Sequence, residues 1–220
     1  MTAHTGIARL GRARREPAGA LEQYRDDGPL AQALGVLGRL VAVPPFLLVG
    51  AGVAGLLALA ALEGDGASDA TLAAGIAWMV LLGGGSSGRP HTDRFAWSTP
   101  GLLRVGEYAG IVWIAANAGG AAPAAAFALL TALAFRHYDL VYRPRFQGVP
   151  VPAWLQVLAG GWDGRLIAVW LLLVAGALPA GLFVLAGILG ATFVADCVMS
   201  WVRHSAAALS VYEDEEDEGQ

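Results

Sequence analysis

The chain has 220 residues, of which 56% are hydrophobic and only 15% are charged. A soluble domain carries about 25% charged residues, so this composition excludes an ordinary soluble protein. The net charge of −4 argues against a basic nucleic-acid-binding protein. The single cysteine, Cys197, excludes a disulfide framework and a cysteine-built zinc site. An integral membrane protein is the class that remains.

The chain begins with a polar segment, residues 1–29, which carries five arginines and which we expect to be a cytoplasmic tail. This segment lacks the apolar run of a signal peptide. Residues 30–43 are expected to form a helix that either lies in the membrane interface or leads into the first span, with Arg39 at the level of the lipid head groups.

Hydrophobic segments then follow one another to the end of a predicted membrane domain, residues 30–207. They predict an all-α, polytopic protein with about six transmembrane helices, at 45–62, 70–84, 99–116, 122–142, 165–178 and 181–203. Several are shorter than the roughly 20 residues that a straight span needs. The last segment, 208–220, is rich in acidic residues and is expected to be a disordered tail.

The arginines predict how the protein is oriented in the membrane. With six spans and a cytoplasmic N-terminus, all 14 basic residues fall at the cytoplasmic face, and every one of them is an arginine. The loops at the opposite face contain none. The positive-inside tendency therefore favours cytoplasmic N- and C-termini, in a multi-pass protein of the bacterial plasma membrane.

Ionisable and aromatic residues near the cytoplasmic helix ends form the candidate site. A charge within the membrane costs roughly 2.5–3.5 kcal/mol, so such residues are expected to meet each other or a polar ligand. Helical spacing groups them on shared faces within the motifs RVGEY, FRHYDLVYR and GGWDGR. We assign candidate catalytic roles to Glu107, His137, Asp139 and Asp163. Candidate substrate-binding residues are Arg104, Tyr108, Tyr138, Tyr142, Arg143, Trp162, Arg165 and Asp196.

The residue types limit the chemistry of this site. Arginines, among them Arg145, present planar forks that suit a phosphate or diphosphate. The carboxylates and His137 suit proton transfer, and the carboxylates also suit Mg²⁺ as a cofactor. Because the third and fourth spans are joined by a short loop, Glu107 and Asp139 are expected to face one another. The sequence contains no P-loop, no GxSxG motif and no HExxH motif, and the CDP-alcohol phosphotransferase signature is not satisfied.

The Glu-Tyr, His-Tyr-Asp-x-x-Tyr-Arg and Gly-Trp-Asp-Gly-Arg blocks occur in this order within residues 89–176. In these blocks the chain resembles an uncharacterised actinobacterial membrane domain that often occurs fused behind a CDP-alcohol phosphatidyltransferase domain. The resemblance implies a place near polar-lipid or inositol-phosphate head-group metabolism, and it implies no particular reaction. Residues 1–88, in front of the matching region, are not expected to form a transferase domain.

The leading hypothesis is a membrane-embedded enzyme that acts on a phosphate- or diphosphate-bearing lipid or isoprenoid at the cytoplasmic interface. One alternative is an isoprenoid cyclase, in which a buried acid starts the reaction and aromatic rings shield the cation. Another is a non-catalytic lipid-binding or scaffold subunit. The partners expected are a membrane lipid or isoprenoid, and a CDP-alcohol phosphatidyltransferase or a prenyltransferase, with no nucleic acid.

Overall fold

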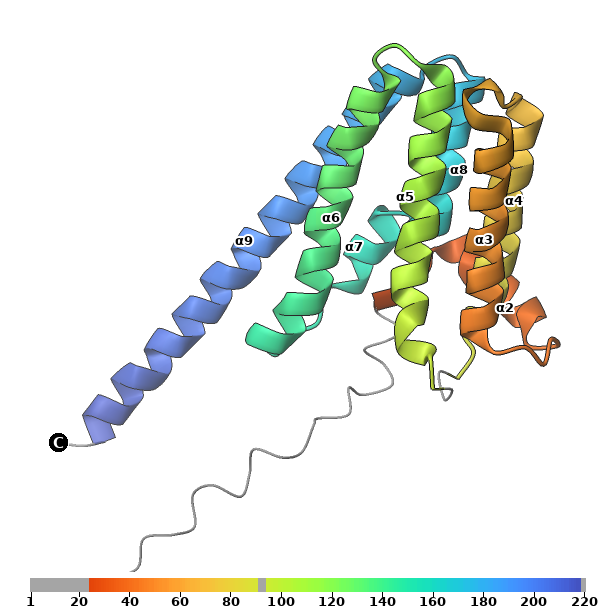
Figure 1. The fold of residues 1–220 in the computed structure, drawn as a ribbon. Helices are drawn as coiled ribbons and strands as arrows, with labels where there is room; N and C mark the ends of the chain where they lie inside the picture. Colours follow the sequence, from red (N-terminus) through yellow and green to blue (C-terminus); the bar gives the residue numbers. More distant parts are fainter. Residues whose placement is uncertain (1–23, 91–93, 219–220) are drawn as a thin grey trace, which may run out of the picture.

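The structure is a computed structural model that describes residues 24–90 and 94–218 (Figure 1). The regular secondary structure of these residues is entirely helical, which confirms the all-α class. Each of the six predicted hydrophobic segments lies mainly within a helix.

The first part of the described chain forms three helices, α2 (Pro29–Gly38), α3 (Pro45–Glu63) and α4 (Asp69–Gly85). Proline begins both α2 and α3, where its missing N–H group is not needed and its fixed φ suits the first turn. Ser68 caps α4 by accepting a hydrogen bond from the backbone N–H of Thr71 at 3.1 Å. The helix expected within residues 30–43 is present as α2, and it ends just before Arg39.

The second part forms α5 (Thr99–Ala118), α6 (Ala122–Phe146), α7 (Ala153–Leu158), α8 (Gly161–Val174) and α9 (Leu178–Glu218). The short helix α7 was not predicted. Helix α8 starts at Gly161, four residues before the predicted segment, because Gly160 adopts a left-handed conformation that sets the turn from α7. Helix α9 continues through Glu218, into the segment expected to be an acidic tail.

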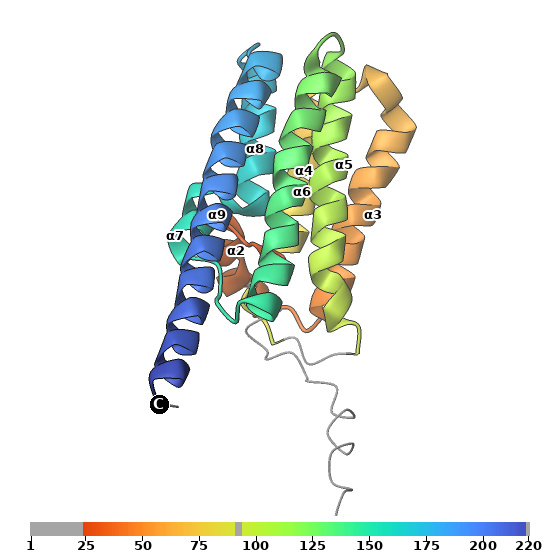
Figure 2. The same ribbon diagram turned by 90° about the vertical axis from the view of Figure 1, so that its left-hand side faces the viewer.

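The long helices run up and down beside one another in two groups. Helices α3, α4, α5 and α8 stand side by side, whereas α6 and α9 pack along each other and lean away from the rest towards their lower ends (Figures 1 and 2). Helix α9 is about 60 Å long at 1.5 Å per residue, and its C-terminal part extends beyond the other helices. A shared core of buried aliphatic side chains, with Trp113, Trp162 and Phe193, joins the two groups.

Four helical segments are long and apolar enough to cross a membrane. They are Pro45–Gly66, Ala122–Phe146, Trp154–Val174 and Leu178–Ala206. Helix α4 is apolar but shorter, and the 20-residue helix α5 is not among the four. The composition is therefore that of a membrane protein with four clear candidate spans, two fewer than the six expected.

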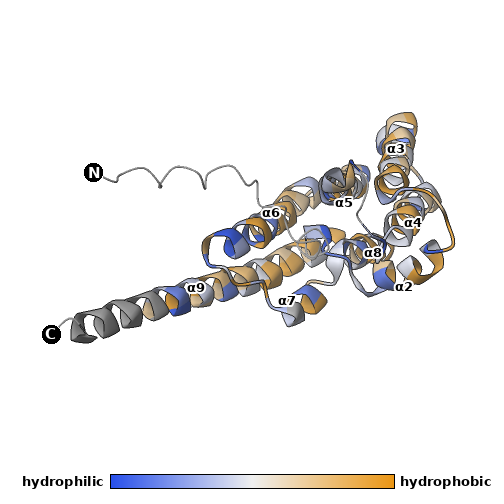
Figure 3. Cartoon of the chain, turned by 90° about the horizontal axis from the view of Figure 1, so that it is seen from below, coloured by the Kyte–Doolittle hydropathy of each residue, from blue (hydrophilic) through white to orange (hydrophobic). Residues whose placement is uncertain are grey.

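One end of the bundle gathers the polar connections. The described segment before α2 and the connection from α4 to α5 lie in the lower part of Figure 1, and the connection from α6 rises from there through α7 to the start of α8. Seen from this end, the hydrophilic residues lie near the ends of α6 and α8 and along α9 (Figure 3). The candidate site residues from the sequence lie on the helix turns towards this end.

Candidate functional site

A cluster of four ion-paired side chains lies inside the bundle, and we call it the central ion cluster. Arg165 of α8 joins two buried carboxylates, with its Nε 2.5 Å from Glu107 Oε1 and its Nη2 2.8 Å from Asp26 Oδ2. Arg104 Nη1 lies 2.7 Å from Glu107 Oε2 and 3.8 Å from Asp26 Oδ2. Two cations thus balance two anions, which is the condition under which buried charges are tolerated.

Asp26 belongs to a segment that the sequence analysis placed in the arginine-rich tail. The structure instead packs residues 24–28 against the start of α8. Arg25 is 1% exposed and lies 2.7 Å from Asp27, and it also donates to Ser86 Oγ at 3.0 Å. Ser87 Oγ donates to Asp27 as well, at 2.7 Å. These residues were missed; the signal for them was the charged triplet Arg25-Asp26-Asp27 directly before a Gly-Pro helix start.

The Gly-Trp-Asp-Gly-Arg block holds this N-terminal segment in place. Trp162 Nε1 donates to Asp27 Oδ1 at 2.8 Å. Asp163 accepts from the backbone N–H groups of Gly28 at 2.6 Å and Ala31 at 2.9 Å, which caps the N-terminus of α2 from another helix. Gly161 has φ +66°, and a side chain there would collide with the backbone of Gly28. The polar groups of Trp162 and Asp163 are therefore engaged by the chain itself.

A second ion group joins α6 to α9. Arg143 binds Asp139 one turn before it, at 2.5 Å from Nη2 to Oδ2, and binds Asp196 of α9 at 2.7 Å. Close by, Ser200 of α9 donates to Gln147 Oε1. Glu107 and Asp139, which were expected to face one another, thus lie in different ion groups, and each already has an arginine partner.

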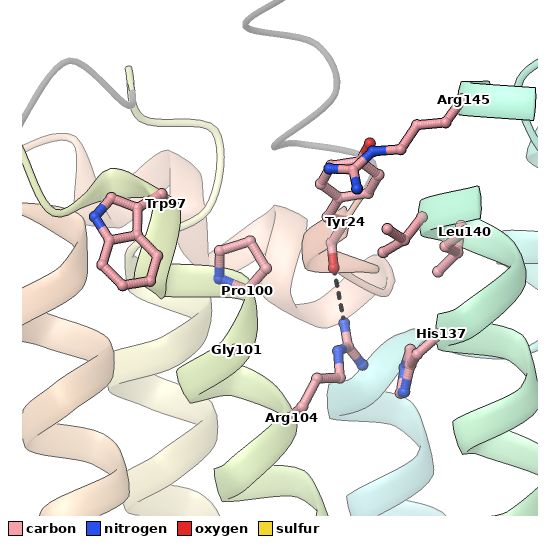
Figure 4. Close-up of a pocket in the computed structure, with 9 residues that line it drawn as sticks. Tyr24, Trp97, Pro100, Gly101, Arg104, His137, Leu140 and Arg145 are labelled. Carbon is pink, nitrogen blue, oxygen red and sulfur yellow. Dashed lines mark hydrogen bonds between the residues drawn. The ribbon is translucent and has the colours of Figure 1, made fainter. Parts of the chain in front are cut away.

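A pocket of about 310 Å³ opens at the polar end of the bundle, between α5 and α6. Figure 4 shows the guanidinium groups of Arg104 and Arg145, with the Tyr24 ring, on one side of His137. Trp97 and Pro100 form the opposite part of the wall. Arg104 is oriented by donating to the backbone oxygens of Tyr24 and Arg25. The pocket therefore combines two guanidinium groups, of which that of Arg104 is ion-paired with Glu107, with an imidazole and aromatic surface.

His137 is positioned by a partner from the neighbouring helix. The Tyr108 hydroxyl lies 2.7 Å from His137 Nδ1. His137 Nε2 is buried and has no hydrogen-bond partner among the described residues. Of the predicted site residues, Arg104 and His137 line this pocket, and Tyr108 contacts it through its hydrogen bond with His137.

The remaining predicted residues lie elsewhere. Tyr138 and Tyr142 are 59% and 39% exposed and stack on each other, with ring centroids 4.2 Å apart, on the outer face of α6. Arg143 and Asp196 line a second pocket of about 250 Å³, together with Arg203 and His204. The described part of the chain contains no group of three or more His, Cys, Asp or Glu residues that could hold a metal ion, so its carboxylates give no support for a Mg²⁺ site.

Comparisons with known proteins place the chain in a family. Nothing among the curated proteins or the solved structures matches it. A protein-family model does match, over residues 15–218, which include the N-terminal segment, the GGWDGR block and α9. The chain therefore belongs to the family of unknown function DUF5941.

Proposed function

We propose that this protein crosses the membrane six times, with both termini on the cytoplasmic side. Helices α4 and α5 lie alongside the clear candidate span α3 and run in alternating directions with it (Figure 2). Helix α5 carries Arg104 and Glu107, which lower its hydropathy, but both charges are neutralised within the central ion cluster. The loops at the arginine-free end are short, as expected for the translocated side.

We infer that the pocket binds the phosphate-bearing head group of an amphiphile from the cytoplasmic side of the membrane. The observation that supports this most strongly is the meeting of Arg104, Arg145 and His137 around one cavity at the polar bundle end. Guanidinium groups match phosphate oxygens in geometry and charge. Trp97 at the rim is 72% exposed and offers an apolar surface at the depth where head group and hydrocarbon tail join.

Reaction at the phosphate is assigned to His137 rather than to Glu107 or Asp139. In the tautomer that carries its proton on Nδ1 and donates it to the Tyr108 oxygen, Nε2 would accept a proton from water as the water oxygen bonds to phosphorus, and would return it to the alcohol oxygen of the amphiphile as the P–O ester bond breaks. Glu107 and Asp139 already accept hydrogen bonds from arginines, which is the bonding pattern of carboxylates. Acid-initiated isoprenoid cyclisation therefore finds no support in the described residues.

The binding step is tested by titrating the purified protein in lipid nanodiscs and measuring bound ligand by native mass spectrometry. The probes are two matched pairs, farnesyl phosphate with farnesol and dioleoyl phosphatidic acid with dioleoylglycerol. We expect the phosphate to raise affinity at least about tenfold within one or both pairs. The substitution Arg145→Gln should remove that gain, whereas Arg39→Gln, at an exposed arginine of the same bundle end, should keep it. Equal binding within both pairs would refute the proposal.

The catalytic step is tested by ³¹P NMR of farnesyl phosphate incubated with the reconstituted protein. Turnover by the wild type that is lost in His137→Gln, with binding retained, supports an enzyme. If the wild type binds the phosphorylated probe and converts none of it, the role of His137 in catalysis is refuted and the non-catalytic lipid-binding reading takes its place.

A further inference from the structure

Arg136 is a buried arginine, and two of its three guanidinium nitrogens have no hydrogen-bond partner among the described residues. The residue is 1% exposed, and both its Nε and its Nη1 are shielded and without a partner. Its guanidinium carbon lies 5.4 Å from the centroid of the Phe193 ring of α9. The other buried arginines of the described residues, in contrast, are all ion-paired, namely Arg25, Arg143 and Arg165.

This arrangement is unfavourable for a residue that serves only the fold. A buried guanidinium without acceptors loses its hydration, and the aromatic ring replaces only part of that loss. The carboxylates that act electrostatically on Arg136 are those of Asp26 and Asp139, and each is bound by another arginine. Arg136 therefore has the properties of a group that binds an anion from outside the described residues.

Arg136 lies next in the chain to a residue of the pocket. Arg136 directly precedes His137 on α6, and successive helical side chains point about 100° apart. His137 lines the pocket, and its Nε2 is also buried and without a partner. Two unsatisfied nitrogen groups thus follow one another on α6, one in the pocket wall and the next facing α9.

We propose that Arg136 binds a second phosphate, so that the ligand of this protein is a diphosphate-bearing amphiphile. The inference rests on the proposed head-group pocket. One phosphate would be held by Arg104 and Arg145 in the pocket wall, and the other by the unpartnered Nε and Nη1 of Arg136, which directly precedes His137 on α6 and is not itself among the residues that line the pocket. A monophosphate would leave Arg136 unpaired, whereas a diphosphate supplies the missing acceptor.

The test compares farnesyl phosphate with farnesyl diphosphate in nanodisc titrations of the wild type and the variant Arg136→Met. We expect the wild type to bind the diphosphate at least about tenfold more tightly, because charge-assisted hydrogen bonds are added. The variant should bind both probes with similar affinity and keep the wild-type affinity for farnesyl phosphate within about threefold. The control Arg39→Met, at an exposed arginine of the same bundle end, should retain the preference.

Thermal unfolding separates a ligand-binding role from a structural one. Without ligand, Arg136→Met should unfold at the wild-type temperature or above it, because methionine fits beside Phe193 and leaves no unpaired group. Farnesyl diphosphate should raise the unfolding temperature of the wild type more than that of the variant. A large loss of stability in the ligand-free variant would show that Arg136 is structural and would overturn the inference.

The outcomes also distinguish the two proposals. If the wild type binds both phosphorylated probes equally, and more tightly than farnesol, only the role of Arg136 is refuted. If it binds neither better than farnesol, the head-group pocket itself fails. If inorganic diphosphate binds as tightly as farnesyl diphosphate, in an Arg136-dependent way, the diphosphate site is supported and the amphiphile is refuted.

Discussion

Replacing Arg165 with methionine tests whether the central ion cluster holds the bundle together. Arg165 joins Glu107 at 2.5 Å and Asp26 at 2.8 Å, and both carboxylates are fully buried. Its removal leaves two anions with one cation, Arg104, which lies 2.7 Å from Glu107 but 3.8 Å from Asp26. Breaking a buried pair in this way costs about 3–5 kcal/mol, a large part of the total stability of a typical protein.

The assay is the free energy of unfolding in mixed micelles, measured for Arg165→Met and for the double variant with Asp26→Asn. The double variant keeps the neutral pair of Arg104 and Glu107, so we expect it to recover more than half of the loss. A single variant within about 1 kcal/mol of the wild type, or a double variant less stable than the single one, would refute the reasoning.

Three further predictions concern the N-terminal segment and the topology. Gly161→Ala should destabilise the protein by about 2 kcal/mol or more, because φ is positive there and the methyl group collides with Gly28; limited proteolysis should then cut before α2. Asp163→Ala should cost about 1–2 kcal/mol through loss of the α2 cap, seen as faster hydrogen exchange in Pro29–Gly38. Alkaline phosphatase fusions after Glu63 and Gly119 should be active and a C-terminal fusion inactive; periplasmic activity at the C-terminus would contradict the six-span topology.

The helices were predictable because they depend on local properties of the sequence. Apolar runs, proline in first turns and glycine at helix ends are visible without tertiary information, and they located all six long helices. The first residue of α8 was harder to predict from the sequence. The turn that starts this helix depends on the packing of Gly160 and Gly161 against residues 24–28. Four of the six predicted spans are clear candidates by length and hydropathy, and the other two remain a prediction, because α4 is short and α5 carries charges.

The candidate site was predictable as a set of residues but not as a set of partners. Helical spacing correctly joined Asp139 to Arg143 and Arg104 to Glu107, which are pairs within one turn. It could not show that Arg165 would bind Asp26, a residue 139 positions away in the chain. Pairing across such a separation depends on how helices pack, which a single sequence does not display.

Photocrosslinking tests the central claim most directly, that the pocket between α5 and α6 holds a phosphate-bearing head group. The probe is farnesyl phosphate with a diazirine on the carbon chain next to the phosphate, reacted in nanodiscs and mapped by peptide mass spectrometry. The account predicts labels concentrated in residues 96–104 and 137–145, competed by unlabelled farnesyl phosphate and not by farnesol. Labels spread over the outer faces of α3 and α9, with no competition, would contradict it.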